Sequence, residues 1–330
     1  MRHQLLRPVL TAFTAALVTV LWVLLNDRVD ALWNLRLAYV AMYVTVLAGM
    51  VLLVGHTGQV SLGHGAFMAV GGYTFALALL HGYSLPVAFL LVAVVGMIFG
   101  VGVGVVAARL SGPYLAGLTL GLAVGLPALA NRFPELLGGD SGLLLDGPYP
   151  PESFGMEFPI ERWQAWIAGF VAILVLAMLS SLVTSPTGRA MRAVRDHESA
   201  AALSGINPAR AKIAAFTVSS VTAALAGAVL SAILGLTAPG AFGIGLSLSL
   251  LVGIVVGGRH SLVGAVFGAL LLALLPELLA GVVGNLALPD RVGVNLAAML
   301  YGCLLLLTVG LAPAGFAGLI QKAWRGRLSR

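Results

Sequence analysis

A succession of long apolar segments most constrains how this chain can fold. Ten of them follow one another along 330 residues, and most reach the ~20 residues that a helix needs to cross ~30 Å of hydrocarbon. Only 9% of the residues are charged, against roughly 25% in a soluble domain. We therefore expect an all-α, polytopic protein embedded in a lipid bilayer. The expected spans are residues 9–25, 37–55, 62–80, 85–108, 114–130, 163–183, 213–235, 239–258, 261–284 and 292–312.

Three of these segments are unusual. Residues 62–80 and 114–130 are short and carry glycine or proline, so each is expected either to span fully or to be broken or re-entrant. The first segment follows Arg2 and Arg7 and is similar to a signal peptide, but nine more segments follow it. It is therefore expected to stay as an uncleaved anchor.

The Lys and Arg residues predict the orientation. With the N-terminus inside, 13 of the 18 fall on the inner face and 5 on the outer face, and positive charge favours the cytoplasmic side. Both chain ends are then cytoplasmic, including the tail 313–330. The loop 131–162 is expected to be periplasmic and the loop 184–212 cytoplasmic, within one transmembrane domain, 1–330. The positive charge thus follows topology, and no nucleic-acid partner is expected.

The loop 184–212 contains the longest strongly basic stretch, SPTGRAMRAVRDHESAAALSGINPARAK. Ser185 and Pro186 form a helix start signal, and Gly205 suits a left-handed helix stop. Asn207 and Pro208 repeat the start signal for a second helix. The spacing predicts one amphipathic helix between these signals.

The charges of this predicted helix follow its turns. Arg189, Arg192 and Arg195 recur every third residue, and Asp196 and Glu198 can pair with Arg192 and Arg195 across a turn. The opposite face is shallow, so the helix suits docking on another protein. A solvated basic loop that only fixes topology is the alternative. The shallow face comprises Ala190, Val194, His197 and Ala201.

Several catalytic motifs are missing from the sequence. A phosphate-binding loop needs a lysine followed by Ser or Thr, but Lys212 and Lys322 are followed by Ile and Ala. Glu277 is the one charge well inside an expected span, whereas secondary transporters usually carry intramembrane relays. No metal-ligand cluster or catalytic triad is recognisable, and the single Cys303 excludes an intrachain disulfide. We expect a protein that is not an enzyme and needs no metal or cofactor.

The stretch 55–73, GHTGQVSLGHGAFMAVGGY, joins two expected spans through several glycines. Irregular backbone at membrane depth is tolerated only against protein or a water-filled cavity. This stretch is therefore a candidate lining of a translocation path, and a flexible turn with close glycine packing is the alternative. The candidate residues are Gly58, Gln59, Ser61, Gly63, His64 and Gly65.

At these motifs the chain resembles the LivM-type permease subunits of branched-chain amino acid ABC importers. GQVSLGHGAFMAVGGY is similar to their signature region, RLSGPYLAGLTLG to their central span, and LGGDSGL to an outer turn. GRAMRAVRDHESAAALSGIN resembles their cytoplasmic coupling loop. The segment 239–279 and the ending LAPAGFAGLI also match. Arg-His in GGRHS departs from the family pattern, and residues 1–36 match nothing in particular.

The resemblance implies both site residues and partners. Glu198, Ala200, Ala201 and Gly205 match the pattern by which importer permeases dock on their ATPases. The implied partners are a second homologous permease, two cytoplasmic ABC ATPases and a periplasmic substrate-binding protein. The implied function is import of branched-chain or other apolar amino acids. A urea or short-chain amide permease and a stand-alone secondary transporter or channel are the alternatives.

Overall fold

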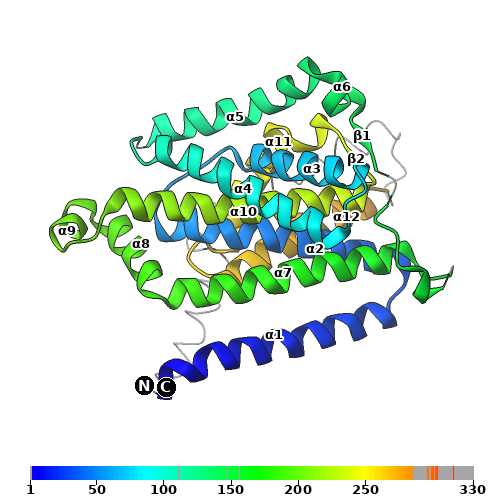
Figure 1. Cartoon of the computed structure of the whole chain (residues 1–330), viewed down its shortest axis with the longest axis horizontal. Helices are drawn as coiled ribbons and strands as arrows, with labels where there is room; N and C mark the ends of the chain where they lie inside the picture. Colours follow the sequence, from blue (N-terminus) through cyan, green and yellow to red (C-terminus); the bar gives the residue numbers. More distant parts are fainter. Residues whose placement is uncertain are drawn as a thin grey trace.

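The structure is a computed structural model that describes residues 2–284, except 111, 146 and 156, together with residues 296, 299, 300, 302, 303 and 315. Described residues are almost all helical (Figure 1). The elements are α1 (Arg2–Arg28), α2 (Ala31–Met50), η1 (Val51–His56), α3 (His64–Leu80), α4 (Leu85–Ala107), α5 (Pro113–Arg132), α6 (Pro134–Leu137), η2 (Gly139–Ser141), β1 (Leu143–Leu144), η3 (Glu152–Phe154), α7 (Ile160–Thr184), α8 (Pro186–Asp196), α9 (Glu198–Leu203), α10 (Pro208–Leu234), β2 (Leu236–Thr237), η4 (Pro239–Phe242), α11 (Ile244–Gly257) and α12 (Leu262–Gly284).

Seven stretches of helix in the described part are long and apolar enough to cross a membrane. They are α2 with η1, α4, α5, α7, α10, η4 with α11, and α12. The expected all-α polytopic architecture is therefore confirmed. α1 covers the expected segment 9–25 as one helix of 27 residues. The segment 292–312 falls almost wholly outside the described residues and the tail 313–330 has only Gly315 within them, so ten spans and two cytoplasmic ends stay predictions.

The two short expected spans differ from each other. α5 is a continuous 20-residue helix that contains Pro127, so the segment 114–130 is not broken. α3 has only 17 residues, and the seven residues that precede it are non-helical. The segment 62–80 is therefore a short helix preceded by irregular chain.

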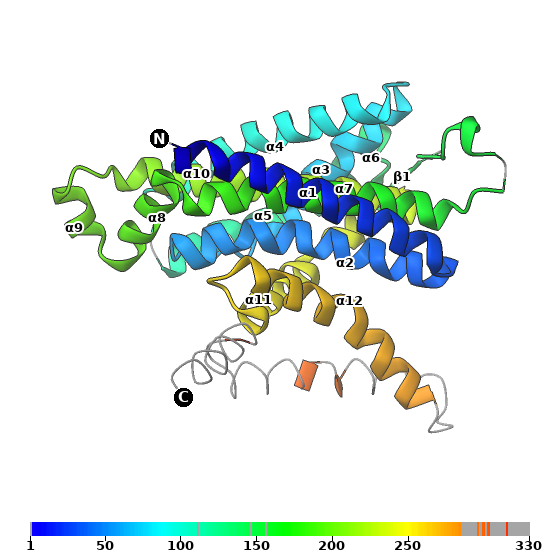
Figure 2. The ribbon, with the colours of Figure 1, turned by 90° about the horizontal axis from the view of Figure 1, so that it is seen from below.

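α10 lies at the centre of the bundle and packs against α4, α3 and α2 (Figures 1 and 2). Small residues allow α3 to approach it closely. A Cβ atom at Gly71 would lie 1.9 Å from the Ala224 carbonyl oxygen, and one at Gly227 would lie 1.8 Å from the Met68 carbonyl oxygen. Lipid tails leave no hydrophobic driving force between helices, so close van der Waals contact between the two backbones stabilises this helix pair.

The two ends of the bundle are built differently. α8 and α9 project from one end, where α1 also begins, and α6, β1 and β2 lie at the other (Figures 1 and 2). β1 pairs antiparallel with β2, joining Leu143 to Thr237 and Leu144 to Leu236. This pairing fastens the loop 131–162 to the connection between α10 and α11.

Candidate functional site

The docking loop, residues 184–212, has both of the helix starts that its sequence predicts. The Ser185 hydroxyl oxygen accepts a hydrogen bond from the Gly188 N–H group at 3.3 Å and caps α8, with Pro186 as the first helical residue. The Asn207 side chain accepts from the Arg210 N–H group at 3.1 Å and caps α10, with Pro208 next. These local signals depend on neighbouring residues only.

The expected single helix between these caps is wrong. The chain forms two helices, α8 and α9, because the backbone at His197 is extended, with φ −158° and ψ 98°. Glu198 pairs neither with Arg192 nor with Arg195. Its two carboxylate oxygens accept from Lys212 Nζ at 2.7 and 2.8 Å instead. This ion pair joins α9 to α10 and offsets part of the helical hydrogen bonding lost at the break.

The arginines of α8 bind the chain itself. Arg189 donates to the Thr184 carbonyl at 3.0 Å, and Arg192 donates to the Val183 carbonyl at 2.9 Å. Both carbonyls belong to the last turn of α7, where helical acceptors lack partners and positive charge is favourable. Two of the three expected docking arginines therefore hold the end of α7.

The outer surface of α9 differs from the expected one. Ala200 is exposed, but Ala201 is buried at 5% exposure and so does not lie on the contact face. Leu203, which the sequence did not single out, is 92% exposed. Gly205 has φ +83° and ends this segment in the left-handed conformation that the sequence predicts. An exposed leucine beside a fixed turn gives α9 an apolar tip.

The glycine-rich stretch, residues 55–73, starts inside a π-helical turn, continues as irregular chain over residues 57–63 and then forms the first part of α3. The Thr57 N–H group donates to the Leu52 carbonyl, and the Gln59 N–H group donates to the Leu53 carbonyl. The side chain of Gln59 is buried. At the start of α3, His64 Nε2 lies 2.9 Å from Ser219 Oγ. Ser219 is eleven residues into α10, about 16 Å along its axis, so the stretch reaches well into the bundle.

Glycine is required by space at two of the candidate positions. A Cβ at Gly63 would lie 2.7 Å from the Thr119 carbonyl oxygen. A Cβ at Gly65 would lie 2.6 Å from the Phe242 carbonyl oxygen and 2.7 Å from Ser247 Oγ. Ser247 Oγ also accepts from the Gly65 N–H group at 2.9 Å. The backbone here is in direct contact with α5, η4 and α11.

Three polar side-chain atoms in this stretch are buried without a hydrogen-bond partner, Gln59 Nε2, His64 Nδ1 and Tyr73 Oη. The side chain of Ser61, between Gln59 and His64, is fully buried and its oxygen accepts from the Gly63 N–H group at 3.3 Å. Buried polar groups normally find partners, so unsatisfied ones mark a position where another polar group can bind. The stretch therefore carries unused hydrogen-bonding capacity in the interior of the bundle.

A cavity of about 570 Å³ joins the two candidate regions. Thr57, Gly58, Gln59 and Val60 line it from the glycine-rich stretch. The docking loop contributes the run from Val194 to Glu198, together with Lys212, and the start of α5 closes the third side. Gly58 has φ +71°, and a Cβ there would lie 3.2 Å from Cγ of Arg195. The docking loop is thus one wall of a space that begins at the glycine-rich stretch.

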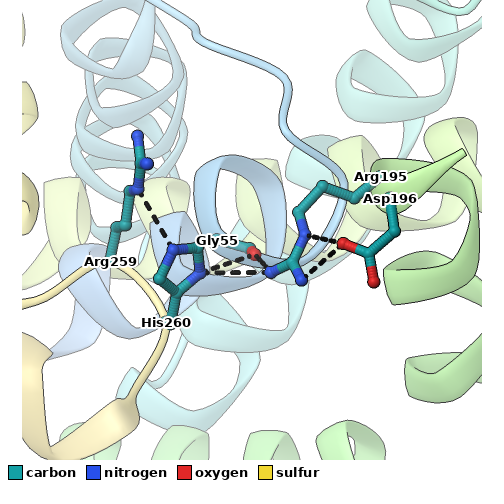
Figure 3. A network of polar contacts seen from close by, with 5 residues as sticks. All are labelled: Gly55, Arg195, Asp196, Arg259 and His260. Carbon is teal, nitrogen blue, oxygen red and sulfur yellow. Dashed lines mark hydrogen bonds and ion pairs between the residues drawn. The ribbon is translucent and has the colours of Figure 1, made fainter. Parts of the chain in front are cut away.

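Figure 3 shows a direct polar link between the same regions. Arg195 Nη1 donates to the Gly55 carbonyl oxygen at 2.6 Å, and its Nε and Nη2 donate to Asp196 at 2.8 and 2.7 Å. His260 Nδ1 also lies 3.1 Å from the Gly55 oxygen, and Arg259 Nε lies 3.2 Å from His260 Nε2. Gly55, Arg259 and His260 are not among the site residues that the sequence predicts. The one feature of the sequence that points to Arg259 and His260 is the unusual Arg-His pair in GGRHS.

Comparisons with known proteins identify the family. Residues 34–309 match the family described as "Branched-chain amino acid transport system / permease component". The permease protein LivM of the high-affinity branched-chain amino acid transport system of Escherichia coli K12 is 33% identical over 267 residues, which cover 72% of this chain and 61% of LivM. LivM of Salmonella typhimurium is 32% identical with the same coverage. The chain thus spans about three fifths of the length of these LivM relatives.

A second group of relatives carries a different name. The autoinducer 2 import system permease protein LsrC of Photorhabdus laumondii is 29% identical over 252 residues, which cover 75% of this chain and 72% of LsrC. No solved structure matches. The family match and the apolar helices make this chain a multi-pass inner-membrane protein. The chain belongs to the family of permease components of branched-chain amino acid transport systems.

Proposed function

We propose that this chain is a membrane-spanning subunit of an ABC importer that carries branched-chain or other apolar amino acids into the cell. Two separate cytoplasmic ATPases would bind the docking loop and supply the energy. A second homologous permease would complete the path, and a periplasmic binding protein would deliver the cargo. The LivM relatives support this cargo class, because their names assign them to branched-chain amino acid transport.

One observation carries the proposal, namely the cavity that the docking loop shares with the glycine-rich stretch. A partner that moves α8 and α9 moves one wall of this cavity. The α9 tip is suited to that contact, because Leu203 is exposed and the ion pair between Glu198 and Lys212 ties α9 to the central helix α10. Force applied at the tip would then reach the bundle through α10 as well as through the cavity wall.

The unpartnered polar atoms support a role for the glycine-rich stretch in the path. An amino acid presents an ammonium and a carboxylate group, and these need hydrogen-bond partners once they leave water. Gln59 Nε2 can donate, and His64 Nδ1 can donate or accept according to its tautomer. We assign Gly58, Gln59, Ser61, Gly63, His64 and Gly65 to the path on this basis.

The test is reconstitution of the complex purified from native membranes with this chain as bait. Proteoliposomes that contain the permeases and ATPases should take up labelled leucine only when ATP and the binding protein are present. Excess isoleucine or valine should compete, and excess urea should not. Uptake by this chain without ATPases would favour a stand-alone transporter, and competition by urea would favour the amide alternative.

The orientation has its own test. In a Cys303→Ser background, an impermeant thiol reagent added to intact cells should label a cysteine at position 149 in the loop 131–162. It should not label one at position 190 in α8. Labelling at position 190 from outside would show that the orientation is the opposite of the predicted one, and cytoplasmic ATPases could then not bind the docking loop.

A further inference from the structure

The carbonyl oxygen of Gly55 is a point where three segments of the chain meet. Gly55 lies in the last turn of η1, whose carbonyls have no following helical N–H groups. Donors come instead from α8, through Arg195 at 2.6 Å, and from the connection between α11 and α12, through His260 at 3.1 Å (Figure 3). These segments are 140 and 205 residues away from Gly55 in the sequence.

The absence of a side chain at Gly55 makes this meeting possible. A Cβ atom there would lie 1.8 Å from the carbonyl oxygen of Arg259. The connection between α11 and α12 is therefore seated directly on the Gly55 backbone. Any side chain at this position would push the connection, and His260 with it, away from the carbonyl.

The hydrogen-bond pattern indicates which tautomer of His260 faces Gly55. Guanidinium groups only donate, so Arg259 Nε, 3.2 Å from His260 Nε2, requires that nitrogen to accept. The tautomer that satisfies both contacts carries its proton on Nδ1, which donates to the Gly55 oxygen. Arg195 Nη1 also lies 3.2 Å from Nδ1, but two donors cannot bond to each other. Both therefore converge on the carbonyl oxygen, which has two lone pairs.

We infer that Arg195 and His260 form a clamp on the Gly55 carbonyl, through which movement of the docking loop reaches the glycine-rich stretch. Asp196 orients the clamping guanidinium, since it accepts from both Nε and Nη2 of Arg195. Arg259 orients the histidine. All four are positioning residues, and their contacts join α8 to the α11–α12 connection at the Gly55 carbonyl. This inference rests on the proposed function, because it assumes an ATPase that moves the loop.

The chain offers closely matched variants for the test. In His260→Asn, the amide nitrogen occupies nearly the position of Nδ1 and keeps the donor. His260→Leu has a similar shape and no donor, and His260→Gln places its amide near Nε2 and loses the contact with Gly55. Arg195→Lys keeps the charge and one donor, whereas Arg195→Met keeps only the stem. Thermal unfolding of each purified variant identifies any that fail to fold. If an Arg195 variant fails to fold, the comparison of His260→Asn with His260→Leu still tests the clamp.

The first measurement is hydrogen exchange at residues 57–63 in the assembled complex, with and without ATP. The wild type and His260→Asn should show an ATP-dependent change in exchange. His260→Leu and His260→Gln should lose it while still binding the ATPases. Arg195→Met should also lose it, and Arg195→Lys should keep part of it. An equal response to ATP in His260→Leu and the wild type would overturn the clamp.

The second measurement is labelled leucine taken up per ATP hydrolysed. This ratio should fall about fivefold in His260→Leu, which loses one neutral hydrogen bond, and further in Arg195→Met, which loses a charged one. A purely structural role would lower uptake and hydrolysis together and leave the ratio unchanged, which contradicts the inference. If the wild type takes up no leucine, the proposed cargo is wrong, and the exchange measurement still decides the clamp.

Discussion

In the glycine-rich stretch, backbone atoms touch where a side chain would not fit, whereas the docking loop is held at its edges by charged side chains. Gly63 and Gly65 contact carbonyl oxygens of other elements. The docking loop is held by Arg192 on the end of α7 and by the ion pair of Glu198 with Lys212. Tight backbone contact leaves no room to adjust, and polar contacts at the surface can form and break. The difference suits a docking loop that can move relative to the tightly packed positions Gly63 and Gly65.

The largest effect should come from filling the backbone contacts. Gly65→Leu would force an overlap with the Phe242 carbonyl and Ser247, and overpacking costs ~1–3 kcal/mol or more. We expect uptake to stop and the thermal midpoint to fall. Gly117→Leu in α5 is the control, because nothing lies within 4 Å of a Cβ there. Equal behaviour of the two variants would show that the stretch is not tightly packed.

Ala201 and Leu203 separate folding from docking within α9. Ala201→Trp places an indole at a buried position and should destabilise α9 by ~1–3 kcal/mol. Leu203→Ala should leave the thermal midpoint unchanged and weaken ATPase binding by roughly tenfold, as truncation of an apolar anchor does. Co-purification of the ATPases with each variant measures binding. Normal binding by Leu203→Ala would place the contact elsewhere.

The ion pair on α9 should show a smaller and asymmetric effect. Glu198→Gln leaves Lys212, whose side chain is only 11% exposed, without its negative counter-charge. Lys212→Met leaves Glu198, which is 55% exposed, to water. Because Glu198 is screened by solvent, we expect ~1 kcal/mol for the first variant and less for the second. A double-mutant cycle with thermal unfolding measures the coupling. No coupling would mean that the pair does not hold α9.

Arg189 should matter least. Arg189→Ala removes one donor and one positive charge from the end of α7, which costs ~0.3–1 kcal/mol at an exposed helix terminus. ATPase binding should stay near the wild-type value. Thermal unfolding at low and high salt checks the effect, which should shrink as salt screens the charge. A large loss of ATPase binding in Arg189→Ala would show that Arg189 contacts the ATPase directly.

Features that depend on local sequence could be predicted, and those that depend on distant contacts could not. Ser185 with Pro186, Asn207 with Pro208, and Gly205 act within a turn of the chain, so their helix boundaries are legible from residue type alone. The apolar segments are likewise legible because the bilayer sets their length.

The interaction partners of the charged residues are what the sequence predicts least well. Glu198 pairs with Lys212 across a loop, and Arg195 reaches Gly55 from 140 residues away. Periodicity on one helix suggested neighbours three or four residues apart, but the break at His197 turned α9 toward α10. The same turn buried Ala201 and exposed Leu203. The packing of α8, α9 and α10 against one another and of α8 against η1 decides these contacts.

Access to the shared cavity tests the central claim most directly. Val60 lines the cavity and is 43% exposed, so Val60→Cys in a Cys303→Ser background can report access from the predicted cytoplasmic side. In complexes that contain both ATPases, ATP should slow thiol labelling at this position. When Leu203→Asp is added to the Val60→Cys variant, the labelling rate at position 60 should be the same with and without ATP. An unchanged labelling rate at Val60→Cys with ATPases bound and ATP present would contradict the account.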